Sequence, residues 1–499
     1  MRILLLLLVA VAAAAEQRNI LFIMSDDHAA HALGAYGGRL AELDPTPTLD
    51  RIASEGMLFE NAFCTNSICT PSRATLLTGQ YSHVNRVTTL NGHLEADRQY
   101  VPKLIGRAGY QTAMVGKWHL KQEPAAFDYY CVLPGQGSYF NPIMRESGGP
   151  WPQNVRRFSQ YDSSHSSDAI TKVSIEWLKR RDKTKPFFLM NHFKSPHDNF
   201  ENAERYDFLY EDVSIPEPAS LWKVPNYGSD ATKGTGTSIG KRNTQRNMGH
   251  HMFVDPGLGA RDYKRAAYQR YLKKYLRTVR GVDDGVARLV KYLEDEGELD
   301  NTVIVYTSDQ GFMLGEHDYI DKRWMYEESL RIPLLVRHPS TAEAGSRSRA
   351  IVNNTDLAPT LLAFAGVETP ELMQGRSLLP IVRGETPADW RKATYYRYWM
   401  NMAHHDNPAH YGVRTKDFKL IFFYGLALDA PGAVDTKTQP GWELYDLRED
   451  PHELNNVYGQ PAYASVVSEL KAELLRLKEE VGDDDAKYPE LMEVRRQYW

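Results

Sequence analysis

The chain has 499 residues, of which 42% are hydrophobic and 25% are charged. This composition is typical of a globular protein and excludes a collagen, a mostly disordered chain and a coiled coil. The 59 Lys and Arg residues against 64 Asp and Glu residues give a net charge of −5, so the composition does not indicate a nucleic-acid partner. The length predicts two or three domains, or one large α/β domain with an appendage.

The first 15 residues have the pattern of a secretory signal peptide. Met1 and Arg2 form a short basic start, residues 3–12 are continuously apolar, and three alanines before Glu16 provide a cleavage site. A membrane span needs about 20 apolar residues, so this run is too short to be one. The alternative is a buried N-terminal strand. The pattern predicts a secreted or periplasmic protein without a membrane span.

Four short apolar runs are each followed by a polar cluster. The runs are Asn19–Met24, Gln111–Val115, Phe187–Met190 and Val303–Thr307, and the clusters that follow them contain Asp26-Asp27, Gly116–His119, Lys194–His197 and Ser308–Gly311. Such runs, separated by helical stretches, are typical of buried strands in a mostly parallel sheet. Because ligands bind at the carboxyl ends of these strands, we expect the four clusters to meet at one edge of the sheet.

The helices between these strands can also be predicted. Thr46 and Pro47 begin a helix that ends at Gly56, and residues 263–296 form a long amphipathic helix that we expect to be interrupted near Gly281 and Gly285. Residues 216–262 have little periodicity and many glycines. We interpret them as a surface insertion in a position to cover the site.

The character of the sequence changes after about residue 383. Residues 395–399 and 419–424 have the pattern of strands, and residues 465–481 have apolar side chains at helical spacing. We therefore expect a main domain over residues 16–383 and a smaller α+β subdomain over residues 384–499.

The segment from Asn66 to Gly79 contains a cysteine at a predicted helix start. Thr70 is a good N-cap and would place Cys69 immediately before a short helix. The helix dipole and Arg73 would then lower the pKa of the thiol. The alternative is a structural cysteine in a loop. The other two cysteines, Cys64 and Cys131, could pair in an oxidising compartment, and the sequence leaves this open.

Residues Cys69–Arg73 match the C-x-P-S-R signature of the type I, formylglycine-dependent sulfatases. The four strand-end clusters match motifs of the same family in the same order, and residues 443–453 resemble part of its C-terminal subdomain. The chain therefore resembles this family over nearly its whole mature length. The resemblance implies an alkaline-phosphatase-like α/β fold, with a mostly parallel central sheet flanked by helices.

The family's chemistry also implies a nucleophile and a metal. A separate formylglycine-generating enzyme would oxidise Cys69 to Cα-formylglycine, whose hydrated gem-diol is the nucleophile. The metal ligands implied are Asp26, Asp27, Cys69 in its modified form, Asp309 and Gln310. Oxygen ligands of this type suit Ca²⁺ or Mg²⁺, and family usage favours Ca²⁺. Many members have Asn or His at the position of Gln310, which still offers a carbonyl oxygen on a longer side chain.

Cleavage of a sulfate monoester also needs cations around the anion and a proton for the leaving oxygen. The residues that match family positions are Arg73, Lys117, His119, His197 and Lys322. The resemblance implies that Arg73, Lys117 and His119 hold the diol and that Lys322 holds the sulfate. His197 would be the general acid, and His119 would help to expel sulfate afterwards. Asp309 could help to deprotonate the diol.

Two segments narrow the expected substrate. Residues 309–331 and 395–414 resemble the subgroup that removes 6-O-sulfate from N-acetylglucosamine in glycosaminoglycan and mucin glycans. The side chains that we expect to contact the sugar are Lys194, Arg323, His404, His405 and Asp406. The alternatives are a sulfatase for another sugar sulfate, a formylglycine-dependent phosphonate or phosphodiester hydrolase, and a non-catalytic glycan binder if Cys69 is unmodified.

Overall fold

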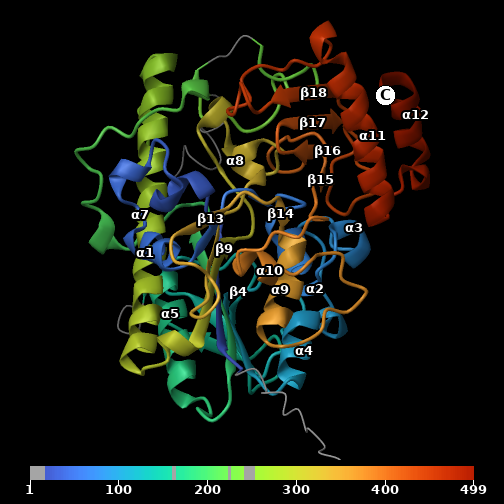
Figure 1. The fold of residues 1–499 in the computed structure, drawn as a ribbon. Coiled ribbons are helices and arrows are strands. Elements are labelled where there is room, and N and C mark those ends of the chain that lie inside the picture. Colours follow the sequence, from blue (N-terminus) through green and yellow to red (C-terminus); the bar gives the residue numbers. More distant parts are fainter. Residues whose placement is uncertain (1–16, 160–163, 223–225, 241–252) are drawn as a thin grey trace, which may run out of the picture.

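The computed structural model describes residues 17–159, 164–222, 226–240 and 253–499. The predicted signal peptide and part of the predicted insertion lie outside these residues. In Figure 1 the helices surround a central sheet, and the C-terminal residues form a separate layer at the upper right.

The central sheet has the strand order β13-β2-β12-β9-β1-β8-β4-β5-β6-β7. Its middle strands, from β9 to β5, are parallel, and antiparallel strands extend it on both sides. The strands of this sheet are β1 (Asn19–Asp26), β2 (Met57–Phe59), β4 (Gln111–Lys117), β5 (Tyr129–Leu133), β6 (Ile143–Glu146), β7 (Val155–Arg157), β8 (Phe187–Pro196), β9 (Thr302–Ser308), β12 (Leu334–Arg337) and β13 (Ser346–Ser348). The four predicted apolar runs are thus the adjacent parallel strands β9, β1, β8 and β4.

Helices cover both faces of this sheet. The α-helices are α1 (Pro47–Glu55), α2 (Cys69–Thr78), α3 (Ser82–Asn85), α4 (Tyr100–Arg107), α5 (Ser166–Arg180), α7 (Ala260–Asp295), α8 (Glu327–Leu330), α9 (Leu357–Phe364), α10 (Leu379–Val382), α11 (Ala464–Val481) and α12 (Pro489–Tyr498). Figure 1 shows α1, α5 and α7 on one side of the sheet and α2, α4 and α9 on the other.

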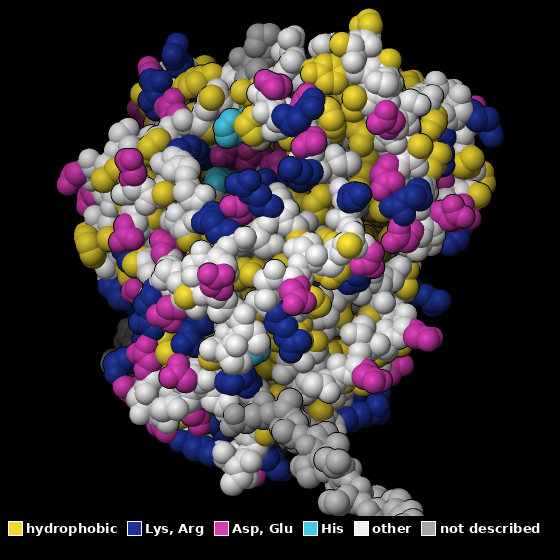
Figure 2. Space-filling model, viewed as in Figure 1, with side chains coloured by type: hydrophobic (Ala, Val, Ile, Leu, Met, Phe, Trp, Pro, Cys, Tyr) yellow, Lys and Arg dark blue, Asp and Glu magenta, His cyan; other side chains and the backbone are white. Residues whose placement is uncertain are grey.

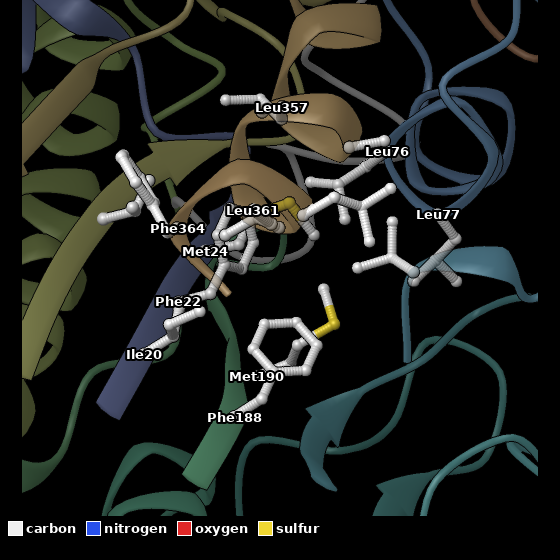
Figure 3. Packing of buried hydrophobic residues seen from close by; sticks show 14 of the residues in the cluster. Ile20, Phe22, Met24, Leu76, Leu77, Phe188, Met190, Leu357, Leu361 and Phe364 are labelled. Atoms are coloured by element: carbon white, nitrogen blue, oxygen red, sulfur yellow. The ribbon is translucent and has the colours of Figure 1, made fainter. Parts of the chain in front are cut away.

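The alternation of β1 explains why its sequence is continuously apolar. Ile20, Phe22 and Met24 belong to one buried cluster, whereas Leu21 and Ile23 belong to a second cluster on the opposite face. Figure 3 shows the first cluster, in which side chains of β1 and β8 pack against leucines of α2 and α9. Because both faces are buried, polar residues are confined to the strand ends.

The C-terminal residues form a four-stranded antiparallel sheet packed against α11. Its strands are β15 (Ala393–Tyr398), β16 (His410–Thr415), β17 (Phe418–Phe423) and β18 (Gly441–Asp446), in that order. Two further short pairs are β3 (Ala62–Phe63) with β14 (Val352–Asn353), and β10 (Met313–Leu314) with β11 (Ile320–Asp321). The predicted fold class, a mostly parallel α/β sheet with a smaller C-terminal unit, is confirmed.

The predicted interruption of the long helix is wrong, because α7 runs through both glycines. A Cβ atom at Gly285 would lie 2.8 Å from Thr171 Oγ1 and 2.9 Å from the Phe193 ring. Gly285 therefore permits the close approach of α7 to α5 and β8, at the cost of some helix propensity.

The two cysteines outside the signature segment do not pair. Cys64 and Cys131 are both free and buried, and they belong to clusters on opposite faces of the sheet.

Among the residues that the structure describes, none of the helices has the length and apolar character needed to cross a membrane.

Candidate active site

The polar clusters meet at the carboxyl edge of the parallel strands. Asp26 is the last residue of β1 and Asp27 follows it, while Asp309 and Gln310 come directly after β9. The pairing of Ser25 with Ser308 places these two strand ends side by side. Because β4 and β8 flank β1 in the same direction, Lys117 and the residues up to His197 reach the same edge.

The cysteine segment approaches this edge from α2. Cys69 is the first residue of α2, not the residue before it, and Ile68 is the N-cap. Thr70 does not cap the helix, since its Oγ1 donates to the carbonyl oxygen of His119 at 3.1 Å. Ser72 donates to the backbone carbonyl of Asp309. These two bonds join the start of α2 to the ends of β4 and β9.

The Cys69 side chain is buried beside a carboxylate and an amide. Its Sγ lies 3.4 Å from Asp26 Oδ1 and 3.9 Å from Gln310 Nε2. Burial and the charge of Asp26 raise the pKa of this thiol well above its usual value. The expectation that the helix dipole lowers this pKa is therefore wrong, because desolvation and a nearby negative charge outweigh a dipole of one short helix.

Three buried carboxylates form a cluster that fits a cation. One oxygen from each of Asp26, Asp27 and Asp309 lies within 4.8 Å of the others. Burial and Asp26 raise the pKa of Asp309 to about 7, and burial raises that of Asp27. Gln310 Oε1 is buried beside them and has no hydrogen-bond partner within the described part of the chain. This set of hard oxygen donors, with one acceptor left unused, suits Ca²⁺ or Mg²⁺.

Three cationic side chains surround the carboxylates. Arg73 donates from Nε and a terminal nitrogen to Asp309 Oδ2, at 3.0 and 2.8 Å. Lys322 Nζ lies 2.7 and 2.6 Å from the two oxygens of Asp27. Lys117 Nζ contacts Asp26. Burial opposes the ionisation of Asp26. Lys117 and the other cations nevertheless hold the pKa of Asp26 well below its usual value.

The two predicted histidines occupy different positions. His119 is half-buried, and desolvation together with Lys117 lowers its pKa well below the usual value. Its Nδ1 lacks a hydrogen-bond partner among the residues described. His197 borders the cavity, with Nε2 3.8 Å from Asp27 Oδ2 and Nδ1 2.5 Å from Asp198 Oδ1.

A cavity of 260 Å³ opens onto the cysteine. It is lined by Cys69, Leu90, Gln136, His197, Asp198, Asp321, Lys322, Arg323, His404 and His405. Six of these residues were predicted from the sequence, and Leu90, Gln136, Asp198 and Asp321 were not. Asp198 and Asp321 are sequence neighbours of predicted residues, and Gln136 follows the carboxyl end of β5. The strand-end rule applied to β5 would have found Gln136.

The predicted sugar-contacting loop lies against the predicted insertion. His405 Nδ1 is 2.9 Å from Thr237 Oγ1, and its Nε2 is 3.5 Å from Asp321 Oδ1. The backbone nitrogen of Gly236 donates to the carbonyl oxygen of Asp406 at 3.1 Å. Asp321 also accepts from Arg323 Nε at 2.8 Å. The described part of the insertion thus contributes to the wall beside the cavity.

Two of the predicted sugar-contacting residues, Asp406 and Lys194, do not line the cavity. The Nζ atom of Lys194 lies 4.6 Å from the centre of the Tyr139 ring. Burial and the nearby Lys117 lower the pKa of Lys194 to about 8. It therefore lies beneath the site, not on its surface.

A second, larger cavity of 540 Å³ lies at the junction with the C-terminal unit. In Figure 2 a hollow with acidic side chains inside and Lys and Arg around it opens where Figure 1 places α8. Two of its carboxylates pair with cations of the same chain: Glu316 with Arg39, and Glu327 with Arg331 and Arg414. This cavity is part of an internal ion-pair network.

Comparison with known proteins gives the family. The model described as Sulfatase matches residues 18–367, and the model described as N-sulphoglucosamine sulphohydrolase, C-terminal, matches residues 315–480. The chain belongs to the sulfatase family. It is therefore a sulfuric ester hydrolase, and the resemblance found in the sequence is confirmed.

Several relatives of this sulfatase have been characterised. It is 41% identical to an N-acetylglucosamine-6-O-sulfatase of Bacteroides thetaiotaomicron, over 94% of this chain and 87% of the relative. It is 30% identical to the human N-acetylglucosamine-6-sulfatase, over 76% and 67% of the two chains. A solved structure of a protein in complex with its substrate D-glucosamine-2-N,6-O-disulfate matches with a TM-score of 0.84 and 40% identity, over 95% of this chain and 100% of the other.

The fold extends beyond sulfatases. The phosphonate monoester hydrolase of Agrobacterium radiobacter matches with a TM-score of 0.70 and 22% identity, over 93% of this sulfatase and 96% of that chain. At this identity the likeness concerns the fold alone.

Proposed function

We propose that this sulfatase hydrolyses sulfate monoesters on carbohydrates, with 6-O-sulfate of N-acetylglucosamine in glycosaminoglycan or mucin glycans as its substrate. The observation that carries the proposal is the cavity in which Cys69, Lys322 and His197 face one another. The cavity can hold the sulfate group between a nucleophile position, a cation and a proton donor. The relatives that act on N-acetylglucosamine 6-sulfate support the choice of sugar.

The reaction also needs a modified residue as the nucleophile and a bound metal ion. We propose that a formylglycine-generating enzyme converts Cys69 to formylglycine, whose hydrate supplies the attacking oxygen. Asp26, Asp27, Asp309, Gln310 and modified residue 69 would hold Ca²⁺, which when bound supplies positive charge to the sulfate and to the hydrate. The unused Gln310 Oε1 and the crowded carboxylates support this assignment.

The chain's own cations and acids have separate roles. Lys322 binds a sulfate oxygen and reduces the charge that builds up during cleavage. Arg73 and Lys117 hold the carboxylates and the hydrate in place, because each already bonds to a carboxylate of the cluster. Asp309 belongs to the carboxylate cluster beside residue 69 and can accept a proton from the hydrate.

The two histidines act on opposite sides of the reaction. His197 protonates the leaving sugar oxygen, because it lines the cavity and Asp198 occupies its Nδ1, which leaves Nε2 for the substrate. His119, whose pKa is lowered by desolvation and by Lys117, remains neutral and assists the release of sulfate from residue 69.

The sugar is bound by the wall opposite the cysteine. We propose that Arg323, His404, His405 and Asp406 contact its hydroxyl groups. His405 is held by Thr237 and Asp321, so its orientation is set before substrate binds. Lys194 does not fit a direct role, and we propose that its charge acts from beneath the site.

The domain boundaries and the location of the protein follow the sequence pattern. We propose that residues 1–15 are a cleaved signal peptide and that the enzyme is secreted or periplasmic. The catalytic domain would extend over residues 16–383, with residues 216–262 as an insertion, and the C-terminal subdomain over residues 384–499.

The test combines mass spectrometry and sulfate release. The sulfatase is produced together with a formylglycine-generating enzyme, and the peptide containing residue 69 is weighed. We expect formylglycine, and sulfate release from N-acetylglucosamine 6-sulfate in preference to the 3-sulfate and to N-acetylgalactosamine 6-sulfate. Cys69→Ala should be inactive, whereas Cys131→Ala, which changes a thiol buried elsewhere, should retain activity.

Each contrary result points to a different alternative. Formylglycine without release from the 6-sulfate would move the substrate to another sugar sulfate. Faster turnover of a phosphonate monoester than of any sulfate ester would favour a phosphonate hydrolase. An unmodified Cys69 despite an active maturation enzyme would favour a glycan binder.

A further inference from the structure

We propose that Asp198 is a positioning residue that fixes the ring of His197, so that Nε2 presents its proton to the leaving oxygen. The inference rests on the proposed function, in which His197 is the general acid. Asp198 was not among the residues that the sequence indicated.

The contacts of the His197 ring support this role. Nδ1 faces two acceptors of Asp198, the carboxylate oxygen at 2.5 Å and the backbone carbonyl oxygen at 2.7 Å. A ring nitrogen that faces two acceptors must carry a proton. Nδ1 is therefore occupied as a donor, and Nε2 is the nitrogen left for exchange with substrate.

The backbone of His197 is held independently of its ring. Its nitrogen donates to the carbonyl oxygen of Lys194 at 3.2 Å, and its own carbonyl oxygen accepts from Phe200 N at 3.2 Å and from the Tyr139 hydroxyl. None of these bonds determines the rotation of the imidazole. Asp198 does so through its carboxylate together with its backbone carbonyl. Its side chain is 32% exposed and lines the cavity, so the pair can work on a bound substrate.

The proton transfer can be written in full. An oxygen of the residue 69 hydrate forms a bond to sulfur and gives its proton to Asp309, while the bond between sulfur and the bridging oxygen breaks and its electron pair moves to that oxygen. The proton on His197 Nε2 transfers to the same oxygen, which leaves as the sugar hydroxyl. The imidazole becomes neutral and keeps its Nδ1 proton on Asp198, and water returns a proton to Nε2 in the next cycle.

If Asp198 positions the general acid, its removal should slow the reaction most for substrates whose leaving group needs a proton. A sugar hydroxyl is a poor leaving group and needs the proton, whereas a nitrophenolate leaves without it. A substituted phenyl sulfate series has no sugar hydroxyls, so it separates proton donation from sugar binding.

The experiment uses the matured, calcium-loaded enzyme. The rate constant kcat/KM is measured for Asp198→Ala and Asp198→Asn on phenyl sulfates of increasing leaving-group pKa. We expect a steeper dependence on that pKa for Asp198→Ala and the steepest for His197→Ala, because the backbone carbonyl of residue 198 still accepts from Nδ1 in the first variant. The double variant should show no change beyond His197→Ala. Asp198→Asn keeps an acceptor oxygen and should lie between Asp198→Ala and the wild type.

The sugar substrate gives a second readout. On N-acetylglucosamine 6-sulfate, kcat of Asp198→Ala should fall about a hundredfold with KM changed less than about threefold. Asp230→Asn, which changes an exposed carboxylate of the insertion, should behave as the wild type. A raised KM with an unchanged phenyl sulfate dependence would instead make Asp198 a sugar ligand and overturn the proposal.

A spectroscopic measurement is independent of turnover. In ¹⁵N-histidine NMR, with His197 assigned from the His197→Gln spectrum, the neutral ring of the wild type should carry its proton on Nδ1. A neutral ring protonated on Nε2 would overturn the proposal. An inactive wild type with the expected tautomer would count against the proposed function and leave the positioning role standing.

Discussion

Lys322 forms a bidentate ion pair with Asp27: the Nζ atom lies 2.6 Å from one oxygen of the carboxylate and 2.7 Å from the other. Both side chains are buried, at 4% and 1% exposure. Burial opposes the charge of Lys322, but the nearby Asp27 carboxylate raises the pKa of Lys322 well above the usual value. The same ammonium group lines the cavity, so it connects the carboxylate cluster to the space for the sulfate.

The position of Lys322 predicts a large loss on its removal. Lys322→Met should lower kcat/KM for the sugar sulfate by about a hundredfold or more, since a preorganised charge beside the reacting group contributes that much. Initial rates on N-acetylglucosamine 6-sulfate measure this. Lys233→Met, an exposed lysine that pairs with Asp230, is the matched control. A loss below about threefold would exclude direct contact of Lys322 with the sulfate.

Gln310 should contribute to calcium binding. Its Oε1 is a buried acceptor next to three carboxylates, and Gln310→Ala removes it. We expect the Kd for Ca²⁺ to rise about tenfold or more, because even side chains that only support a metal ligand contribute that much. Calorimetric titration of calcium-free protein measures it, with the exposed Gln153→Ala as control. Equal affinities would remove Gln310 from the ligand set.

Lys419 should be needed for the attachment of the C-terminal unit. Its fully buried Nζ lies 2.9 Å from Glu327 Oε1 and 2.6 Å from Glu453 Oε1. Lys419→Met leaves two buried carboxylates without this cation and should destabilise the protein by about 3–5 kcal/mol. The midpoint of guanidinium unfolding gives the change. Lys416→Met, an exposed lysine on the same hairpin, should leave the midpoint where it is.

His410 should make stability depend on pH. Its ring lies among aromatic rings, 4.7 Å from that of Phe423 and 5.5 Å from that of Tyr396, and burial lowers its pKa to about 4. Between pH 4 and an unfolded value of about 6.5 the unfolded chain binds the extra proton, so stability falls as the pH falls through this window. The contribution of His410 amounts to about 3 kcal/mol.

The check compares unfolding midpoints at several pH values. The wild type should lose more stability between pH 6.5 and 4 than His410→Phe, which cannot titrate. Parallel curves for the two proteins would show that His410 is protonated equally in the folded and unfolded chains.

Much of the candidate site could be predicted because its signals are local in the chain. Each strand is a short apolar run with polar residues at or directly after its end, as Asp26 ends β1 and Asp309 follows β9. The period of the apolar residues reports burial on both faces of the sheet, and parallel strands bring their carboxyl ends to one edge. The residue types at those ends are therefore enough to indicate a metal and an anion.

The features that the sequence did not predict depend on contacts between segments that are distant in the chain. The continuity of α7 at Gly285 is decided by the packing of Thr171 and Phe193, since the local glycine signal alone predicts a break. The high pKa of the Cys69 thiol results from burial beside Asp26, 43 residues away in the chain.

The direction of side chains is the other quantity that only the tertiary structure decided. Lys194, near the end of β8, and His197, directly after it, belong to the same polar cluster of the sequence. Yet the Lys194 ammonium lies against the Tyr139 ring, whereas His197 borders the cavity. Sequence determined which chemical groups reach the edge of the sheet, because that follows from residue order along a strand. Packing determined which of them face the substrate and with what charge, because desolvation and Coulomb energy depend on neighbours that the order along one strand does not specify.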